Sequence, residues 1–149
     1  MKKILIGLFV DDGIVAFTDN DELQKFQREL EAEFRITAKP ATYFLGIEIN
    51  QQSDGSIKIS QGAYTRKVLE QFGMSNCHPC PTPTIKSEKE REPDESQNDQ
   101  LEFPNRSAVG ALMYLMTGTR PDIAYAVSVA SRKLENPSKS DAVQVKRIY

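Results

Sequence analysis

The chain has 149 residues, of which 39% are hydrophobic and 27% charged, and its formal net charge is −2. This length allows one ordinary domain or two small subdomains, and the near-neutral charge argues against a strongly basic nucleic-acid-binding protein. No apolar stretch approaches the roughly 20 residues of a membrane-spanning helix, so we predict a soluble protein without a membrane partner. Both cysteines lie within residues 77–80, which favours a reducing, intracellular compartment such as the cytoplasm.

Two short apolar runs at the N-terminus, residues 4–9 and 14–17, flank the adjacent carboxylates of Asp11 and Asp12. Each run is rich in β-branched or aromatic side chains, which predicts two strands joined by a tight turn over residues 10–13. The two aspartates would then lie at the tip of a hairpin.

Two neighbouring aspartates repel each other, and an apolar hairpin gains no stability from carrying them. A divalent cation would relieve the repulsion, and hard oxygen ligands on a rigid turn suit Mg²⁺. The alternative is that Asp11-Asp12-Gly13 is only turn chemistry, because hairpin turns select Asp and Gly. Both interpretations remain open from the residues alone.

The next segment reads as an amphipathic helix. Residues 18–22 offer capping side chains and first-turn acids, and apolar residues then follow at helical spacing. These apolar residues are Leu23, Phe26, Leu30 and Phe34.

A second hairpin is predicted from residues 43–50 and 56–60. Both stretches alternate apolar and polar side chains, with Leu45, Ile47 and Ile49 on one face of the first. Asp54-Gly55 between them is a preferred turn sequence.

Residues 62–72 predict a short helix that ends at Gly73, and an extended connector follows it. Cys77, His78 and Cys80 are zinc-ligand types, but tetrahedral zinc needs four ligands and His78 is the only histidine. Residues 82–104 are nearly free of apolar side chains, which predicts a disordered linker.

Three helices are predicted in the C-terminal part. Residues 105–118 place Val109, Leu112, Met113 and Met116 on one face and end at Gly118. The next helix would be capped by Thr119 and stopped at residues 136–137, and the last would open at residues 138–141.

The C-terminal part is also the basic part, since residues 105–149 carry seven basic and three acidic side chains. These cations could contact phosphates, although a solvated helix surface is the slightly favoured interpretation. They are Arg106, Arg120, Arg132, Lys133, Lys139, Lys146 and Arg147.

The stretch Phe9-Val10-Asp11-Asp12 resembles the Tyr-Val-Asp-Asp box of reverse transcriptases. Three further stretches, within residues 43–49, 59–64 and 106–125, resemble the copia-type retrotransposon polyproteins of that family. The resemblance runs in order through nearly the whole chain. It implies an α+β fold with palm-like hairpins and a packed helix (residues 1–81, reaching the start of the thumb), a linker (82–104) and a helical thumb or connection segment (105–149).

The same resemblance implies nucleotidyl transfer on an RNA template and a DNA primer, with Asp11 and Asp12 as catalytic ligands of two Mg²⁺ ions. Phe9 and Val10 would complete the active-site hairpin, with Phe9 replacing the usual tyrosine. Leu45 and Gly46 would form a primer grip, although Gly46 could equally serve close packing or a bulge. A third carboxylate and the nucleotide-binding fingers are expected upstream of this chain, so we expect no polymerase activity in isolation.

Two other functions remain possible. The chain could be a non-catalytic retroelement remnant that binds nucleic acid or protein. An unrelated metal-dependent nuclease is less well supported, because no further acidic or histidine cluster lies at ligand spacing in the sequence.

Overall fold

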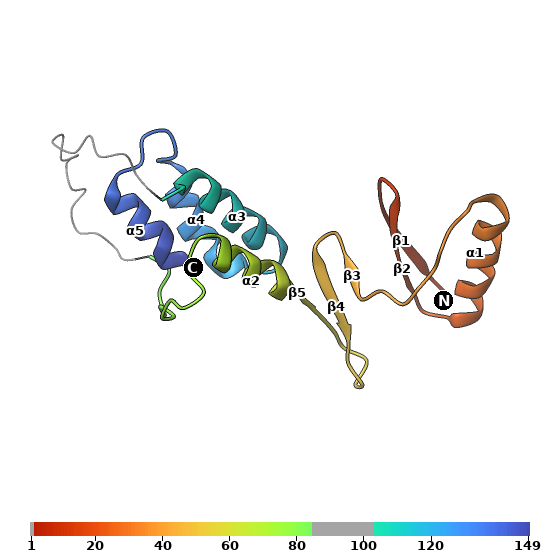
Figure 1. Cartoon of the computed structure of the whole chain (residues 1–149). Helices are drawn as coiled ribbons and strands as arrows, with labels where there is room; N and C mark the ends of the chain where they lie inside the picture. Colours follow the sequence, from red (N-terminus) through yellow and green to blue (C-terminus); the bar gives the residue numbers. More distant parts are fainter. Residues whose placement is uncertain (1, 85–102) are drawn as a thin grey trace. The chain divides into compact units, whose positions relative to one another are not determined.

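The computed structural model describes residues 2–84 and 103–149 (Figure 1). Helices and two small antiparallel sheets make up the fold, which confirms the α+β class. The chain divides into two compact units, which are Met1–Ile59 and Ser60–Tyr149.

The first sheet is a β-hairpin of β1 (Ile4–Phe9) and β2 (Asp12–Phe17). The strands are antiparallel, with Ile4 opposite Phe17 and Phe9 opposite Asp12. The predicted hairpin is therefore confirmed, but its turn is shorter than residues 10–13. Only Val10 and Asp11 lie between the strands, because two-residue turns match the right-handed twist of the paired strands.

Helix α1 (Asn20–Glu33) follows the hairpin and confirms the predicted helix. Asp19 is its N-cap, and Asp19 Oδ1 accepts a hydrogen bond of 3.1 Å from the Glu22 amide. The same carboxylate lies 3.2 Å from the Lys2 ammonium. Phe34 lies beyond the last helical residue in extended backbone and is 63% exposed, so its predicted place in the apolar stripe is wrong.

We expect the stability of α1 to depend on the ionisation of Asp19. The hydrogen bond from the Glu22 amide, and then the Lys2 side chain, lower the Asp19 pKa below its ordinary value of 3.8. A carboxylate with a lowered folded-state pKa contributes stability above its unfolded pKa and loses it as pH falls through the folded value. Helical signal from α1 should therefore fall on acidification below about pH 4, measured by NMR.

Asp19→Asn is the control for this prediction, because asparagine caps helices nearly as well but does not titrate. An unchanged acid profile in this variant would show that other carboxylates cause the loss.

The second sheet has the order β3 (Tyr43–Phe44), β4 (Ile47–Gln51) and β5 (Ile57–Ser60). Asp54-Gly55 forms the predicted turn, with Gly55 at φ +85° and the Ser56 amide donating to Asp54 Oδ1 at 2.8 Å. The prediction of one continuous strand over residues 43–50 is wrong. Leu45 and Gly46 both have positive φ and reverse the chain between β3 and β4.

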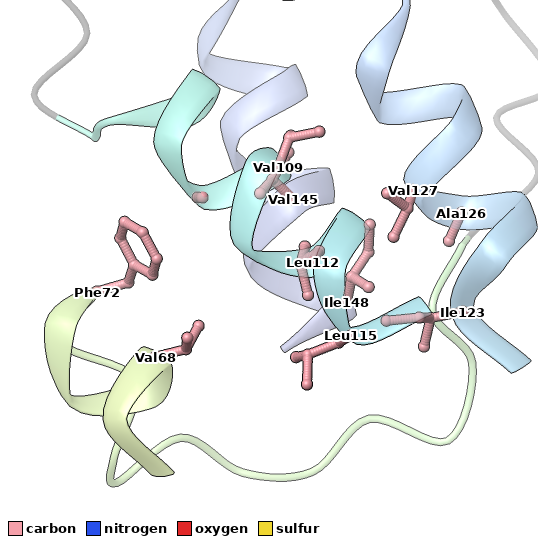
Figure 2. Packing of buried hydrophobic residues seen from close by; sticks show 11 residues of the cluster. Val68, Phe72, Val109, Leu112, Leu115, Ile123, Ala126, Val127, Val145 and Ile148 are labelled. Atoms are coloured by element: carbon pink, nitrogen blue, oxygen red, sulfur yellow. The ribbon is translucent and has the colours of Figure 1, made fainter. Parts of the chain in front are cut away.

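The second unit is helical. It contains α2 (Gly62–Gln71), α3 (Asn105–Gly118), the 3-10 turn η1 (Pro121–Ile123), α4 (Ala124–Ser131) and α5 (Lys139–Ile148). Figure 2 shows one apolar core to which every one of these elements contributes. Its most completely buried large side chains are Leu112, Val68, Val109, Val127 and Val145.

The inner face of α3 differs from the predicted one. Val109 and Leu112 are buried as expected, but Met113 is 43% exposed. Ala108 and Leu115 are buried instead, because α3 is covered from more than one side by the other helices of the unit. The stripe is therefore wider than the one predicted from spacing.

The predicted cap at Thr119 is also wrong. Thr119 is the C-cap of α3, and Arg120 precedes η1. The Thr119 hydroxyl instead donates at 2.9 Å to Oε1 of Gln61, a side chain that is only 3% exposed. Helix α4 ends at Ser131, before the predicted stop, whereas the Ser138–Asp141 capping box of α5 confirms the predicted start of the last helix.

Helix α2 packs in the helical core through Val68 and Phe72. The resemblance placed this helix in the segment 1–81, whereas in the structure it belongs to the unit Ser60–Tyr149. The domain boundaries remain predictions. Most of the predicted linker, residues 85–102, lies outside the described residues.

Candidate active-site hairpin

The candidate catalytic residues lie where β1 turns into β2. Asp11 is the second residue of the two-residue turn, and Asp12 is the first residue of β2, paired with Phe9. Both aspartates are exposed, as is Val10 at 86%. The hairpin therefore exposes two adjacent carboxylates to solvent. The strands that carry them are paired as far as the turn, where Phe9 lies opposite Asp12.

Val10 has a backbone conformation that is unfavourable for its side chain. Its φ is +53°, in the left-handed region that β-branched residues rarely adopt. Such strain costs of order 1–3 kcal/mol and persists only where the surrounding structure enforces it. Valine is a poor choice for this position if turn formation were the only requirement. Turn preference alone therefore does not explain a valine at this position.

The opposite end of the hairpin is closed by hydrogen bonds. The Thr18 amide donates to the Lys3 carbonyl at 3.1 Å, and the Lys3 amide donates to Thr18 Oγ1 at 2.9 Å. Gly7 and Gly13 each lie close to a side chain of the facing strand, Ile14 and Leu8 respectively, so an added Cβ would crowd the pair. These features hold the strands in one register and so define where Asp11 and Asp12 lie.

The donor set suits magnesium in kind, and the described residues add no third protein ligand to it. Mg²⁺ in nucleotide-dependent enzymes is bound by one or two carboxylates, with waters and substrate phosphates as the other ligands. Asp11 and Asp12 supply such carboxylates. Among residues 2–84 and 103–149, however, no three acidic, histidine or cysteine side chains gather as a metal site. This finding covers Cys77, His78 and Cys80 as well, and both cysteines are exposed thiols.

The candidate primer grip forms a second tight turn. Leu45 (φ +48°) and Gly46 (φ +83°) connect β3 to β4, with Phe44 opposite Ile47. Positive φ at both central residues defines a type I′ turn, in which glycine is favoured at the second position. The turn thus explains why residue 46 is a glycine. This explanation differs from both predicted ones, a primer grip and close packing or a bulge. Sequence pattern failed here because Leu45 continued the apolar alternation.

Several of the basic C-terminal residues have partners within the helical unit. Arg120 pairs with Asp122 at 2.7 Å, Lys133 lies 3.5 Å from Asp141, and Lys146 lies 4.7 Å from the centre of the Phe103 ring. Arg147 donates to the carbonyl and hydroxyl oxygens of Thr82, each at 2.9 Å. These contacts argue against one continuous open basic face, although they use only part of the donors of Arg120 and Arg147.

Comparison with known proteins identifies the class of this chain. Residues 1–86 match the family described as "Reverse transcriptase (RNA-dependent DNA polymerase)". The match includes the aspartate-bearing hairpin and both tight turns. The chain therefore belongs to the reverse transcriptase family, and its relatives place it among the copia-type retrotransposon polyproteins.

The relatives cover almost all of this chain. The retrovirus-related Pol polyprotein from transposon TNT 1-94 of Nicotiana tabacum is 38% identical over 97% of the chain, which corresponds to 11% of that polyprotein. An uncharacterized mitochondrial protein of Arabidopsis thaliana is 34% identical over 95% of the chain and 58% of its own length. The Pol polyprotein from transposon RE1 of Arabidopsis thaliana is 32% identical over 99% of the chain and 10% of its length.

The chain thus spans about a tenth of the two Pol polyproteins and little more than half of the mitochondrial protein. No solved structure matches it significantly. Within the described parts of the chain, no helix has the length and apolar character required to cross a membrane.

Proposed function

We propose that this chain carries part of the polymerase active site of a copia-type reverse transcriptase, with Asp11 and Asp12 as ligands of Mg²⁺. Phe9 and Val10 form the rest of the active-site hairpin, and Leu45 and Gly46 form a turn that contacts the primer. The nucleic-acid partners are an RNA template and a DNA primer. The family match carries the class of function, and the two adjacent carboxylates at the turn of a paired hairpin support the assignment of the site.

The role of the hairpin is to position charge. Phosphoryl transfer depends mainly on positioning and on electrostatic stabilisation of the phosphate oxygens. Bound Mg²⁺ would neutralise the triphosphate and favour ionisation of the primer hydroxyl. The chain itself supplies two carboxylates on consecutive residues. The paired strands and their two-residue turn fix where these residues lie.

Titration with Mg²⁺ or Mn²⁺ should perturb the NMR signals of Asp11, Asp12 and their neighbours in the turn. The affinity should be weak, because the described residues supply two carboxylates and no third ligand near them. Asp11→Asn combined with Asp12→Asn should abolish the response, since amide oxygens carry no charge. Asp21→Asn combined with Glu22→Gln, in the first turn of α1, is a matched control for loss of two negative charges and should leave the response intact.

An unchanged response in the Asp11→Asn, Asp12→Asn chain would contradict the metal assignment and favour plain turn chemistry. Equal loss in the control chain would show that general negative charge attracts the ion.

The purified chain should not extend a primed template, even with Mg²⁺ or Mn²⁺ and all four deoxynucleotides. The reason is that the described residues bring no third ligand to the Asp11–Asp12 pair, so charge neutralisation and positioning are both incomplete. A gel-based primer-extension assay measures this. Template-dependent incorporation that disappears in the double aspartate variant would show that the site is complete after all.

A further inference from the structure

A cavity of about 410 Å³ in the helical unit is not used by the proposed polymerase site. Its walls come from the extended segment after α2, from η1 and from the end of α5. In Figure 1 that segment runs beside the end of α5, where the C-terminus is marked. The volume falls in the range of small-molecule sites.

The walls of this cavity combine apolar rings with two guanidinium groups. The residues that line it are Pro79, Cys80, Pro81, Pro83, Arg120, Asp122, Ile123, Arg147, Ile148 and Tyr149. The two arginines and Asp122 together give these side chains a formal charge of +1, which the terminal carboxylate of Tyr149, another lining residue, offsets. A ligand with an apolar body and an anionic group would be complementary to this lining, because the apolar walls can contact its body and the guanidinium groups its anion.

Both arginines form hydrogen bonds that use only part of their N–H donors. Arg147 uses Nε and one terminal nitrogen on Thr82, which ties the extended segment to α5. Arg120 uses the same two nitrogens on Asp122, at 2.9 and 2.7 Å. A guanidinium has five N–H donors, so within the described residues these contacts account for two donors of each arginine and leave three.

The pair of guanidiniums favours a phosphate over a carboxylate. A planar carboxylate is satisfied by a single arginine, whereas a phosphate monoester offers three terminal oxygens and a charge between −1 and −2. Asp122 does not block this role, because both of its oxygens are turned to Arg120. The planar guanidinium is pre-organised, so an arginine loses less side-chain entropy for each hydrogen bond that it forms.

We propose that this cavity binds the phosphate of a nucleotide unit, with Arg120 and Arg147 donating to its oxygens and the proline and isoleucine walls contacting the sugar. The inference depends on the proposed function only for the class of ligand, a nucleotide that carries a terminal phosphate monoester. The site lies wholly within residues 60–149, so it can be tested separately from the aspartate hairpin.

Thymidine 5′-monophosphate is the probe, titrated into the isotope-labelled 149-residue chain and followed by amide NMR shifts. Saturable shifts are expected in three groups of residues, 79–84, 120–123 and 147–149. Thymidine, which lacks the phosphate, should cause none of them. Inorganic phosphate should shift the same arginine-bearing groups with weaker affinity, because it lacks the sugar.

Two independent variants test the arginines. Arg120→Gln combined with Asp122→Asn removes the ion pair without leaving a lone charge, and should weaken binding roughly tenfold. Arg147→Gln should have a similar effect. Arg132→Gln lowers the net charge by one outside the cavity, as Arg147→Gln does within it, and should change the affinity by less than about twofold.

Two further chains separate the proposal from other causes. A Gly-Ser extension after Tyr149 moves the terminal carboxylate away from the cavity, and binding should be equal or tighter. The Asp11→Asn, Asp12→Asn chain should bind thymidine 5′-monophosphate normally while its metal response is lost. Absence of saturable shifts at millimolar probe, shifts outside the three groups, or equal weakening by Arg132→Gln would overturn the phosphate site.

Discussion

Leu112→Ala should destabilise the helical unit by roughly 2–5 kcal/mol, the range for large-to-small changes in well-packed cores. Leu112 is 1% exposed and lies in the core that α2, α3, η1, α4 and α5 share (Figure 2). Truncation removes apolar contacts and leaves a cavity, because the elements around it cannot all relax together. Urea unfolding followed by circular dichroism, with α3 amide exchange as a local probe, measures the loss.

Met113→Ala is the matched control for this prediction. Met113 is the next residue of α3 and is 43% exposed, although the spacing pattern placed both side chains on the same face. Its replacement should cost well under 1 kcal/mol, because alanine has the higher helix propensity and little apolar area is lost. Similar losses in the two variants would contradict the orientation of α3 in the structure.

Gly118→Ala should destabilise the helical unit by roughly 1–3 kcal/mol, the cost of overpacking. A Cβ added at Gly118 would lie 2.6 Å from Cδ and 2.7 Å from Nε2 of Gln61. The Gln61 side chain is buried and accepts the Thr119 hydroxyl hydrogen bond at 2.9 Å, so it cannot move away without losing that bond. Urea unfolding again provides the measurement.

The Gln61→Ala, Gly118→Ala double variant tests the cause. With the glutamine side chain absent, the alanine at 118 meets no clash and gains helix propensity. The double variant should therefore lose less unfolding free energy than the two single variants together, by about 1 kcal/mol or more. Strict additivity would show that Gly118 is required for its backbone conformation alone. Gly118 does not have a positive φ, which argues against that explanation.

Periodicity and turn chemistry were sufficient for most elements. The β1–β2 hairpin, α1, α2, α3 and the start of α5 all have the predicted type, and their ends agree within a few residues. Local interactions decide these features. Examples are the Asp19 side chain that caps α1 and the capping box of Ser138 and Asp141. Such contacts join residues three apart in the chain, so the local sequence predicts them.

Backbone strain could not be predicted in the same way. Nothing in the stretch around Val10 indicates a positive φ, since valine is among the residues least suited to it. Leu45 is similar, because its apolar side chain fitted the strand pattern while its backbone forms a turn. In both places the pairing of whole strands fixes the turn, and the local preference of one residue is overridden.

By itself, the sequence indicated the α+β class, the order of most elements, and a hairpin that carries two adjacent aspartates within the stretch that matches the reverse transcriptase family. Only the tertiary structure decided which face of α3 is buried, that the Gln61 side chain lies against Gly118, and that Arg147 binds Thr82. The physical reason is sequence separation. Gln61 and Thr119 are 58 residues apart, and Thr82 and Arg147 are 65 residues apart. Side chains so distant meet only when helices pack, and no periodic pattern records which partner each will find.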